Sequence, residues 1–366
     1  MTEQYTRRGC AARRLAASRP YFARPPFLEG TGGENLSAAY FHSTNRGKRS
    51  VEADFETEDG RALVRKLARH ADVVVENFKV GGLAKYGLDA ASLRAAHPRL
   101  VYCSVTGFGQ TGPYAPLAGY DFMIQGMAGV MDLTGFPDGP PMKAGYATAD
   151  IYCGLYAAIG ILAALRRRDE TGEGATLDMA LMDSQVAVLG YQAINYFVSG
   201  VVPTRLGNGH PNIVPYDVFP VADGSIILAI GNDRQFARLC EAVGAEDLRD
   251  DPDYATNQGR VRNRAVLVPL LGRRTIRFRR DDLLETLGKL KVPAGPVNSV
   301  ADVFADAQVI ERGIRVDLPA PEAKGGTIPT LRSPIVIDGT PMVAERPSPR
   351  LGAHTQEVLA DPAWGG

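Results

Sequence analysis

The sequence predicts an α/β protein built on a parallel sheet, with helices on the faces of that sheet. Between about Ser50 and Val198, segments with helical and strand-like apolar patterns alternate along the chain. This alternation is typical of a parallel sheet. The chain has 366 residues, which is too long for one small core, so we expect two domains.

The first half of the chain supplies the alternating pattern. Residues 61–70 form an amphipathic helical pattern, and residues 72–78 form a short apolar strand. The same patterns predict a helix at 90–96, a strand at 100–105, helices at 121–133 and 151–168, a strand at 175–181 and a helix at 183–198. A stretch rich in Gly, Asn and Pro at 203–215 then indicates a loop.

The second half predicts a smaller unit and a return to the first domain. Its expected elements are a strand at 225–230 and helices at 233–243, 263–271 and 281–290. We expect Pro293–Pro296 to break the chain. The predicted organisation is a large domain at 31–200, a linker and small domain at 201–318, and a return to the large domain at 319–366.

Residues 1–30 differ from the rest of the chain. Met1–Arg24 is rich in arginine and has no apolar periodicity, so we expect it to contribute no packed structure. A transit peptide, a disordered basic arm and out-of-frame translation are all compatible with this atypical segment.

The composition argues against several classes of function. The 41 basic residues balance the 41 acidic ones, unlike in a typical nucleic-acid binder. The four cysteines and five histidines are scattered, so we expect a reduced, cytoplasmic protein without a bound metal. The apolar run at 151–165 is shorter than the ~20 residues that a membrane span needs. We interpret it as a buried core helix of a protein that does not bind membranes.

Asp150 is the most informative residue, because it directly precedes that apolar run. A helix that begins there presents N–H groups without partners inside the helix. An aspartate at this place is either an N-cap, whose side chain accepts from the first turn, or a nucleophile. Small residues around it, such as Gly145 and Gly154, would let a bulky ligand approach the backbone.

The segment Gly107–Gly112 matches the dinucleotide-binding fingerprint only literally. Pro113 follows at once, so no helix begins where a pyrophosphate would need one. We interpret the segment as a flexible loop over a ligand, or as a plain turn.

A series of motifs, taken in order over residues 38–359, resembles the family III coenzyme A transferases. This group includes formyl-CoA and carnitine CoA-transferases. The motifs are Asn45–Val51, Val75–Phe78, Gly87–Leu88, Pro98–Pro113, Gly119–Asp121, Ala147–Asp150, Thr171–Gly174, Pro293–Pro296 and Leu351–Thr355.

The resemblance implies a Rossmann-like large domain made from both chain ends, a smaller domain between them, and a homodimer of interlocked chains. It implies that Asp150 is the catalytic nucleophile. Coenzyme A is then a substrate, with no separate cofactor, and its implied contacts are Ala53, Asp54, Phe55, Glu56, Asn77, Phe78 and Lys85. The implied contacts of the acyl substrate are Tyr120, Gly107, Gly109 and Gln110. Lys48 and Arg49 are either phosphate contacts or part of a solvated basic loop.

The implied reaction passes CoA from an acyl-CoA, with succinyl-CoA as the expected donor, to a carboxylic acid such as glutarate. Asp150 would first form a mixed anhydride and then a CoA thioester, which splits a hard exchange into easier steps. The helix N-terminus and the amides of Gly107–Gly112 would stabilise the oxyanions. A dicarboxylate also needs a partner for its distal carboxylate, either Arg205 or His210.

Two other functions stay open from the sequence. An α-methylacyl-CoA racemase has the same fold, but it carries a histidine base where this chain has Tyr120, and a phenol is a poor base near neutral pH. The second open function is that of an inactive CoA-binding or assembly subunit. It is considered because Met1–Arg24 does not match the N-terminal strand and helix that are usual in the family.

Overall fold

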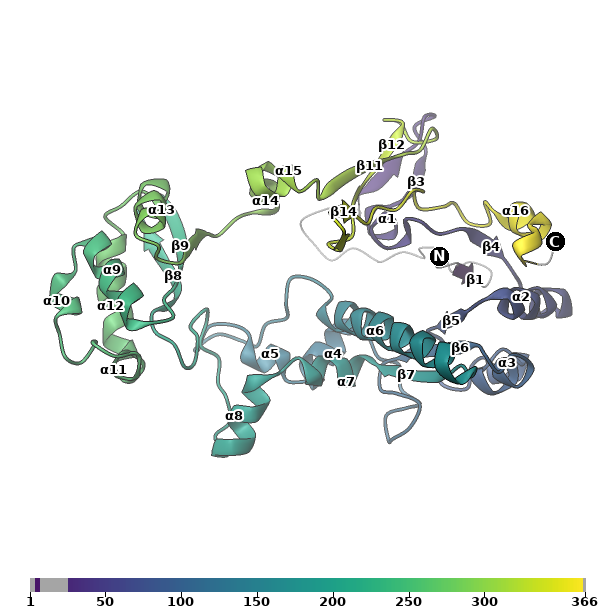
Figure 1. Ribbon diagram of the computed structural model, residues 1–366, viewed down its shortest axis with the longest axis horizontal. Coiled ribbons are helices and arrows are strands. Elements are labelled where there is room, and N and C mark those ends of the chain that lie inside the picture. The colour runs from purple at the N-terminus through teal and green to yellow at the C-terminus, as the bar shows by residue number, and fades with distance from the viewer. Residues whose placement is uncertain (1–3, 7–25, 365–366) are drawn as a thin grey trace. The chain divides into compact units, whose positions relative to one another are not determined.

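The structure is a computed structural model that describes residues 4–6 and 26–364 (Figure 1). The chain forms two compact units. The first contains Met1–Ala118, Cys153–Ala180 and Val300–Gly366, and the second contains Gly119–Tyr152 and Leu181–Ser299. Residues 119–152 thus group with the second half of the chain, which no sequence pattern indicated. The domain limits given above stay predictions.

The first unit contains the predicted parallel sheet. Its strands are β5 (Val73–Glu76), β6 (Val101–Thr106) and β7 (Thr176–Ala180), in the order β5-β6-β7. Val73 pairs with Val101, and Tyr102 pairs with Thr176, both in parallel register. The α/β fold class is confirmed.

Two predicted helices accompany this sheet in the first unit (Figure 1). α2 (Glu58–His70) begins before the predicted Arg61, because the side chain of Thr57 accepts the N–H of Gly60 and caps the helix. α3 (Ala90–Ala96) has its predicted limits.

Shorter elements make up the rest of the first unit. The strand pairs are antiparallel: β2 (Phe27–Glu29) with β3 (Asn35–Ala38), β11 (Arg315–Pro319) with β12 (Thr327–Leu331), and β13 (Val336–Ile337) with β14 (Thr340–Pro341). The helical elements are α1 (Ala39–Asn45), η1 (Ala84–Tyr86), α14 (Val300–Ala305), α15 (Ala307–Glu311), α16 (Thr355–Ala360) and η2 (Pro362–Trp364).

The N-terminal segment departs from the prediction in one place. β1 (Gln4–Thr6) pairs in parallel with β4 (Ser50–Glu52), although we expected no packed structure from Met1–Arg24. Strand pairing uses backbone groups that every residue but proline carries, so an apolar pattern is not needed for it. Residues 1–3 and 7–24 of this segment lie outside the described residues.

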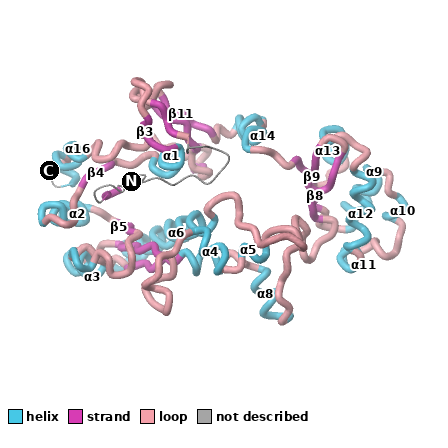
Figure 2. The backbone as a smooth tube through the Cα atoms, turned by 180° about the vertical axis from the view of Figure 1, so that it is seen from behind, coloured by secondary structure: helices cyan, strands magenta, loops and turns pink. Residues whose placement is uncertain are grey.

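The second unit contains an antiparallel sheet, which Figure 2 shows beside its helices. The strands are β8 (Tyr216–Val221), β9 (Gly224–Ala229) and β10 (Ala294–Pro296), in the order β10-β9-β8. β10 corrects the prediction that Pro293–Pro296 breaks the chain, since a proline is tolerated on an edge strand. The helices are α9 (Asp233–Val243), α10 (Glu246–Arg249), α11 (Asn257–Arg262), α12 (Arg264–Thr275) and α13 (Arg280–Lys289).

Two helices predicted as continuous are each divided by a glycine. The first becomes α4 (Asp121–Met127) and α5 (Val130–Leu133), and the second becomes α7 (Leu181–Ala187) and α8 (Tyr191–Ser199). Gly129 has φ 83° and Gly190 has φ 53°. Positive φ angles interrupt an α-helix and are easily adopted by glycine.

α6 (Thr148–Thr171) reverses the expectation of a buried core helix. Its buried side consists of small residues such as Ala157, and a Cβ on Gly160 would lie 3.6 Å from Leu177 of β7. The large apolar side chains are exposed on another side: Ile151, Leu155, Ile159 and Leu162. By length and composition alone, α6 is also long and apolar enough to cross a membrane.

Candidate active site

Asp150 lies inside the first turn of α6 and does not cap the helix. α6 begins at Thr148, and the N–H of Ile151 already donates to the carbonyl of Ala147 at 3.1 Å. Asp150 is exposed, and within the described part of the chain neither its carboxylate nor its N–H has a hydrogen-bond or ion-pair partner. Of the two interpretations that the sequence left open, the N-cap is therefore wrong.

A different aspartate caps α6. Asp121, the first residue of α4, accepts the N–H of Ala149 through Oδ1 at 2.8 Å. Its Oδ2 accepts a hydrogen bond from Nε2 of Gln125 at 2.7 Å. Because a capping oxygen satisfies one of the first-turn donors that lack a partner inside the helix, the Asp150 carboxylate remains uncommitted.

Buried amide side chains hold the segment that leads into α6. Gln125 is 0% exposed, and its Oε1 accepts the N–H of Ala144 at 2.9 Å. Its Nε2 also approaches the carbonyl of Tyr146, at 3.4 Å. Gln185 of α7, 1% exposed, accepts the hydroxyl of Thr148 at 3.1 Å. Satisfied polar networks of this kind rigidify a buried region, so the start of α6 has a fixed position within the second unit.

The surroundings of Asp150 raise the pKa of its carboxyl group. The residue as a whole is exposed, but the atoms packed around the carboxyl group remove part of its water, and this desolvation is the larger cause. The second cause is the negative charge of Asp121. A carboxylate with a raised pKa is more basic once it is ionised, which favours nucleophilic attack.

Tyr120 lies directly before α4, beside the aspartate that caps α6. It is 74% exposed, and its carbonyl accepts the N–H of Ile124 at 3.0 Å while its side chain makes no capping hydrogen bond to α4. Its phenol is therefore accessible to a ligand of the second unit, the unit that also contains Asp150.

The predicted glycine loop of the first unit is anchored by two side chains. The N–H of Gly109 donates to Oγ1 of Thr106 at 2.9 Å, and the N–H of Gln110 donates to Oδ2 of Asp178 at 2.9 Å. Gly107 and Gly109 are buried, and Gly109 has φ 87°. Two of the amides suggested for oxyanion stabilisation are therefore already engaged.

Most of the residues predicted to bind CoA lie together in the first unit. The ring centroid of Phe55 is 6.1 Å from that of Phe78 and 6.0 Å from that of Tyr86. The Tyr86 hydroxyl donates to Glu56 at 2.8 Å, and Nζ of Lys85 lies 4.5 Å from the centroid of the Tyr86 ring. We call these five residues the aromatic cluster.

The other predicted CoA contacts lie next to the aromatic cluster in the sequence. Ala53 is buried, and Oδ1 of Asp54 accepts the N–H of Glu56 at 3.1 Å, which shapes the turn. Asn77 is exposed. Phe55 and Tyr86 are 3% and 8% exposed, so their rings pack in the core and offer no open face to a base. The exposed side chains of Asn77 and Lys85 remain able to contact the polar groups of a nucleotide. Contact with CoA itself stays a prediction.

Arg49 is committed inside the first unit and is not part of a solvated loop, whereas its contact with a phosphate stays a prediction. It is buried and pairs with Glu357 at 3.3 Å and with Asp361 at 3.1 Å. Lys48 donates to Oδ1 of Asn45 at 3.1 Å, and burial lowers the pKa of its amino group.

Neither candidate for the distal carboxylate is an uncommitted cation. Nη1 of Arg205 donates to the side chain of Asp132 at 2.8 Å and to its carbonyl at 3.1 Å. Nδ1 of His210 accepts the N–H of Asn212 at 3.1 Å, so Nε2 carries the proton. Burial, and then the charge of Arg264, lower the pKa of His210. His210 is therefore a neutral hydrogen-bond donor at pH 7.

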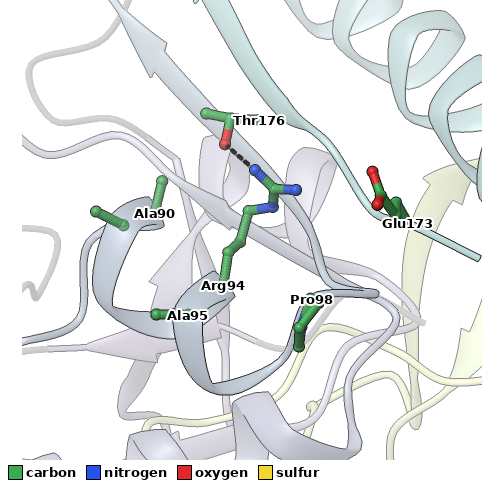
Figure 3. A pocket seen from close by; sticks show the side chains of 7 residues that line it. Ala90, Arg94, Ala95, Pro98, Glu173 and Thr176 are labelled. Atoms are coloured by element: carbon green, nitrogen blue, oxygen red, sulfur yellow. Dashed lines mark hydrogen bonds between the residues drawn. The ribbon is translucent and has the colours of Figure 1, made fainter.

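An open hollow of about 510 Å³ in the first unit has a different lining (Figure 3). It is lined by Ala90, Ala91, Arg94, Ala95, Pro98, Glu173 and Thr176. Arg94 there donates to Oγ1 of Thr176 and to the carbonyl of Gly174, both at 3.2 Å. None of the predicted site residues lines this hollow. Among residues 4–6 and 26–364, no group of three or more His, Cys, Asp or Glu side chains is placed to hold a metal ion.

Sequence reasoning missed two residues that organise these groups, Asp121 and Asp178. Asp121 ends the Gly119–Asp121 motif, and Gln125 follows it by one helical turn, which is a spacing that lets the two side chains meet. That spacing was the available signal. No local pattern connects Asp178 to Gln110, which lies 68 residues earlier in the chain.

The comparisons with known proteins agree with one another. The family model for CoA-transferase family III matches residues 23–355. The succinate–glutarate CoA-transferase of Agrobacterium fabrum is 56% identical over 338 residues, which are 92% of this chain and 84% of that protein. The succinyl-CoA:glutarate CoA-transferase of Mus musculus is 37% identical over 92% of this chain and 76% of the mouse protein.

The fold of this chain is similar to that of a solved structure. The crystal structure of a CaiB/BaiF family protein from Brucella suis has a TM-score of 0.81 and 54% sequence identity, and the match covers 92% of this chain and 86% of that chain. Family model, sequence relatives and solved structure thus span the same large part of the chain. The chain belongs to CoA-transferase family III and is an enzyme of that family.

Proposed function

We propose that this enzyme transfers CoA from succinyl-CoA to a dicarboxylic acid such as glutarate, with Asp150 as the nucleophile. The observation that carries the proposal is the uncommitted Asp150 carboxylate in the first turn of α6, whose pKa is raised by desolvation and by Asp121. The names of relatives that are 56% and 37% identical support the two acids.

In the first half of the reaction, Asp150 takes CoA from the donor. A carboxylate oxygen of Asp150 attacks the thioester carbon of succinyl-CoA, the C–S bond breaks, and CoA leaves as the thiolate. The thiolate then attacks the aspartyl carbon of the mixed anhydride and displaces succinate. Asp150 is left as a CoA thioester, so the energy of the thioester bond is kept within the enzyme.

In the second half, the acceptor repeats these steps in reverse. A carboxylate of glutarate attacks the aspartyl thioester and displaces the CoA thiolate. The thiolate attacks the glutaryl carbon of the new anhydride, which releases glutaryl-CoA and restores the Asp150 carboxylate. No proton needs to be exchanged with water, and no net hydrolysis occurs.

Each attack creates an oxyanion that needs a donor. The N–H of Asp150 is the first-turn amide of α6 without a partner in the described structure. An amide in that position, at the positive end of the helix dipole, is suited to stabilise developing negative charge. The amides of Gly109 and Gln110 become available only if they release Thr106 and Asp178.

Recognition of the distal carboxylate is assigned to Arg205 or His210. The ion pair with Asp132 leaves Arg205 with other guanidinium donors, whereas His210 offers the N–H of Nε2 without a charge. Replacing the recognising residue by glutamine should raise KM for glutarate but leave KM for a monocarboxylate unchanged. A residue whose replacement raises KM for both acids equally does not recognise the distal carboxylate.

We also propose that the working enzyme is a homodimer. The exposed apolar side chains of α6 are 48 to 67% exposed, and Phe197 and Val198 of α8 are 73% and 83% exposed. Large apolar patches of this kind mark interaction sites. We expect the interface between two copies to have the size of obligate interfaces, roughly 2,000 Å² or more, and each of these two groups of side chains to form part of it.

The proposal is tested by incubating the purified chain with succinyl-CoA and an equimolar mixture of glutarate, malonate and butyrate. Acyl-CoA products are identified by mass spectrometry, with Asp150→Asn as the control. We expect glutaryl-CoA and little free CoA. Free CoA alone, or butyryl-CoA as the main product, would contradict the proposal.

A further inference from the structure

We infer that Asp121 is a positioning residue for the reaction at Asp150, because it caps α6 from outside and so keeps the Asp150 carboxylate from capping the helix itself. This inference rests on the proposed role of Asp150 as nucleophile. It concerns residues of the second unit only.

Asp121 binds one of the N–H donors in the first turn of α6. The N–H of Thr148 donates to the carbonyl of Tyr146 at 3.0 Å, and the N–H of Ala149 donates to Asp121 at 2.8 Å. Only the N–H of Asp150 is left without a partner among the described residues. Asp121 therefore takes the donor that lies next to the nucleophile in the sequence.

In the absence of the Asp121 carboxylate, Asp150 would be the acidic side chain best placed to cap α6. Acidic side chains in the first turn of a helix are attracted to unpaired N–H groups there. Without Asp121, the N–H of Ala149 would be unpaired, and the nearest carboxylate in the sequence would be that of Asp150. A carboxylate that accepts such a bond is less nucleophilic and points along the helix instead of toward a substrate.

Asp121 is itself held in place by hydrogen bonds to both oxygens of its carboxylate. Oδ1 accepts from Ala149 and Oδ2 accepts from Gln125. Gln125 is fully buried and also bonds the backbone N–H of Ala144. The position of α4, the segment before α6 and the start of α6 are therefore coupled through one carboxylate.

The charge of Asp121 gives the inference a specific signature. Titratable side chains lie near Asp150 in the chain or on the elements that contact its segment. Two lie on neighbouring helices, Asp121 on α4 and Asp183 on α7, and three lie in the segments that precede α4 and α6: Tyr120, Lys143 and Tyr146. Of these, the charge of Asp121 is the one that acts on the pKa of Asp150, and it raises it. Removal of this charge should lower that pKa, whereas removal of a charge that does not act on Asp150, such as that of Asp183, should leave it unchanged.

The test compares Asp121→Asn, Asp121→Ala and the matched control Asp183→Asn. Asparagine keeps an acceptor for Ala149 but removes the charge. The pH dependence of kcat/KM falls on its acidic side as the nucleophile is protonated, so Asp121→Asn should move this acidic limb to lower pH. Asp121→Ala should also lower the plateau by about tenfold or more, since a displacement of about 1 Å can cost about a hundredfold in rate. Asp183→Asn should change neither the acidic limb nor the plateau of the pH profile.

A second measurement does not depend on activity. The Asp150 carboxyl group is titrated by carbon-13 NMR in protein with labelled aspartate, and its signal is assigned from Asp150→Asn. We expect a lower midpoint in Asp121→Asn than in the wild type. An unchanged midpoint, or the same shift in Asp183→Asn, would overturn the inference. A lowered midpoint in Asp121→Asn, together with a wild-type protein that transfers no CoA, would show that Asp121 acts on the Asp150 carboxyl group but would refute the proposed function.

Discussion

Replacing Asp150 by asparagine should separate the stability of this protein from its activity. Asparagine has nearly the same shape as aspartate but is neither charged nor an effective nucleophile. Since the Asp150 carboxylate has no partner in the described structure, no hydrogen bond is lost. We expect transfer to fall at least about a thousandfold, which corresponds to more than about 4 kcal/mol of transition-state stabilisation.

The expected effect on stability has the opposite sign. The folded-state pKa of Asp150 is raised, so the ionised form costs some stability at neutral pH, and the substitution removes that cost. The side chain is exposed, and water screens the effect, so the gain should stay within about 0.5 kcal/mol. The gain should be present above the folded pKa and vanish as the pH falls below about 3.9, the usual value for aspartate.

Urea denaturation and initial rates, measured on the same preparations, check both parts. Asp121→Ala is the matched comparison, because the residue that caps α6 should lose about 1 kcal/mol of stability when it is truncated. The reasoning would be refuted if Asp150→Asn lost about 1 kcal/mol and Asp121→Ala lost none. It would equally be refuted if Asp150→Asn kept activity in proportion to its folded fraction.

Three further predictions concern other parts of the molecule. Arg260 is 0% exposed and donates to the carbonyl of Val214 at 2.7 Å, so Arg260→Met, which leaves that carbonyl without a donor, should lower the free energy of unfolding by about 1–3 kcal/mol. An unchanged or higher stability in urea would show that the second unit does not depend on this bond. Asp178→Ala should speed hydrogen exchange at the N–H of Gln110 by about tenfold or more, because this N–H loses its bond to a charged acceptor. Unchanged exchange would mean that Asp178 does not hold the loop at Gly107–Gly112. Leu155 is 57% exposed, so Leu155→Glu should convert the proposed dimer to a monomer in light scattering at micromolar concentration, and a persistent dimer would place the interface elsewhere.

The regular elements of the fold were predictable wherever the apolar pattern was long and periodic. α3 and α9 have their predicted limits, and the strands of the parallel sheet lie where the sequence indicated. The errors occurred at positions that a pattern does not encode. Gly129 and Gly190 divide helices through their backbone angles, and β1 pairs through backbone groups alone.

The packing of α6 shows a different limit. An uncharged run indicates burial but does not say which side faces the core. In α6 the small residues face the sheet, and the large apolar residues are exposed. Burial within one chain was therefore overestimated, because a sequence pattern does not distinguish an intramolecular core from a surface that another molecule covers.

The candidate site was predictable as a set of residues but not as an arrangement. The resemblance pointed to Asp150 and to four members of the aromatic cluster, Phe55, Glu56, Phe78 and Lys85. It did not point to Tyr86, which joins them only in the structure. The role of Asp121 depends on a contact between residues 28 positions apart, and such a contact follows from the tertiary fold and not from local spacing.

The central claim is that Asp150 carries CoA during the reaction, and covalent trapping tests it most directly. The wild-type protein is mixed with succinyl-CoA without an acceptor, treated with borohydride or hydroxylamine, digested and analysed by mass spectrometry. We expect a modification on the peptide that contains Asp150, on that residue alone, and none in Asp150→Asn. A modified carboxylate elsewhere, or full turnover without any modification of Asp150, would contradict the claim.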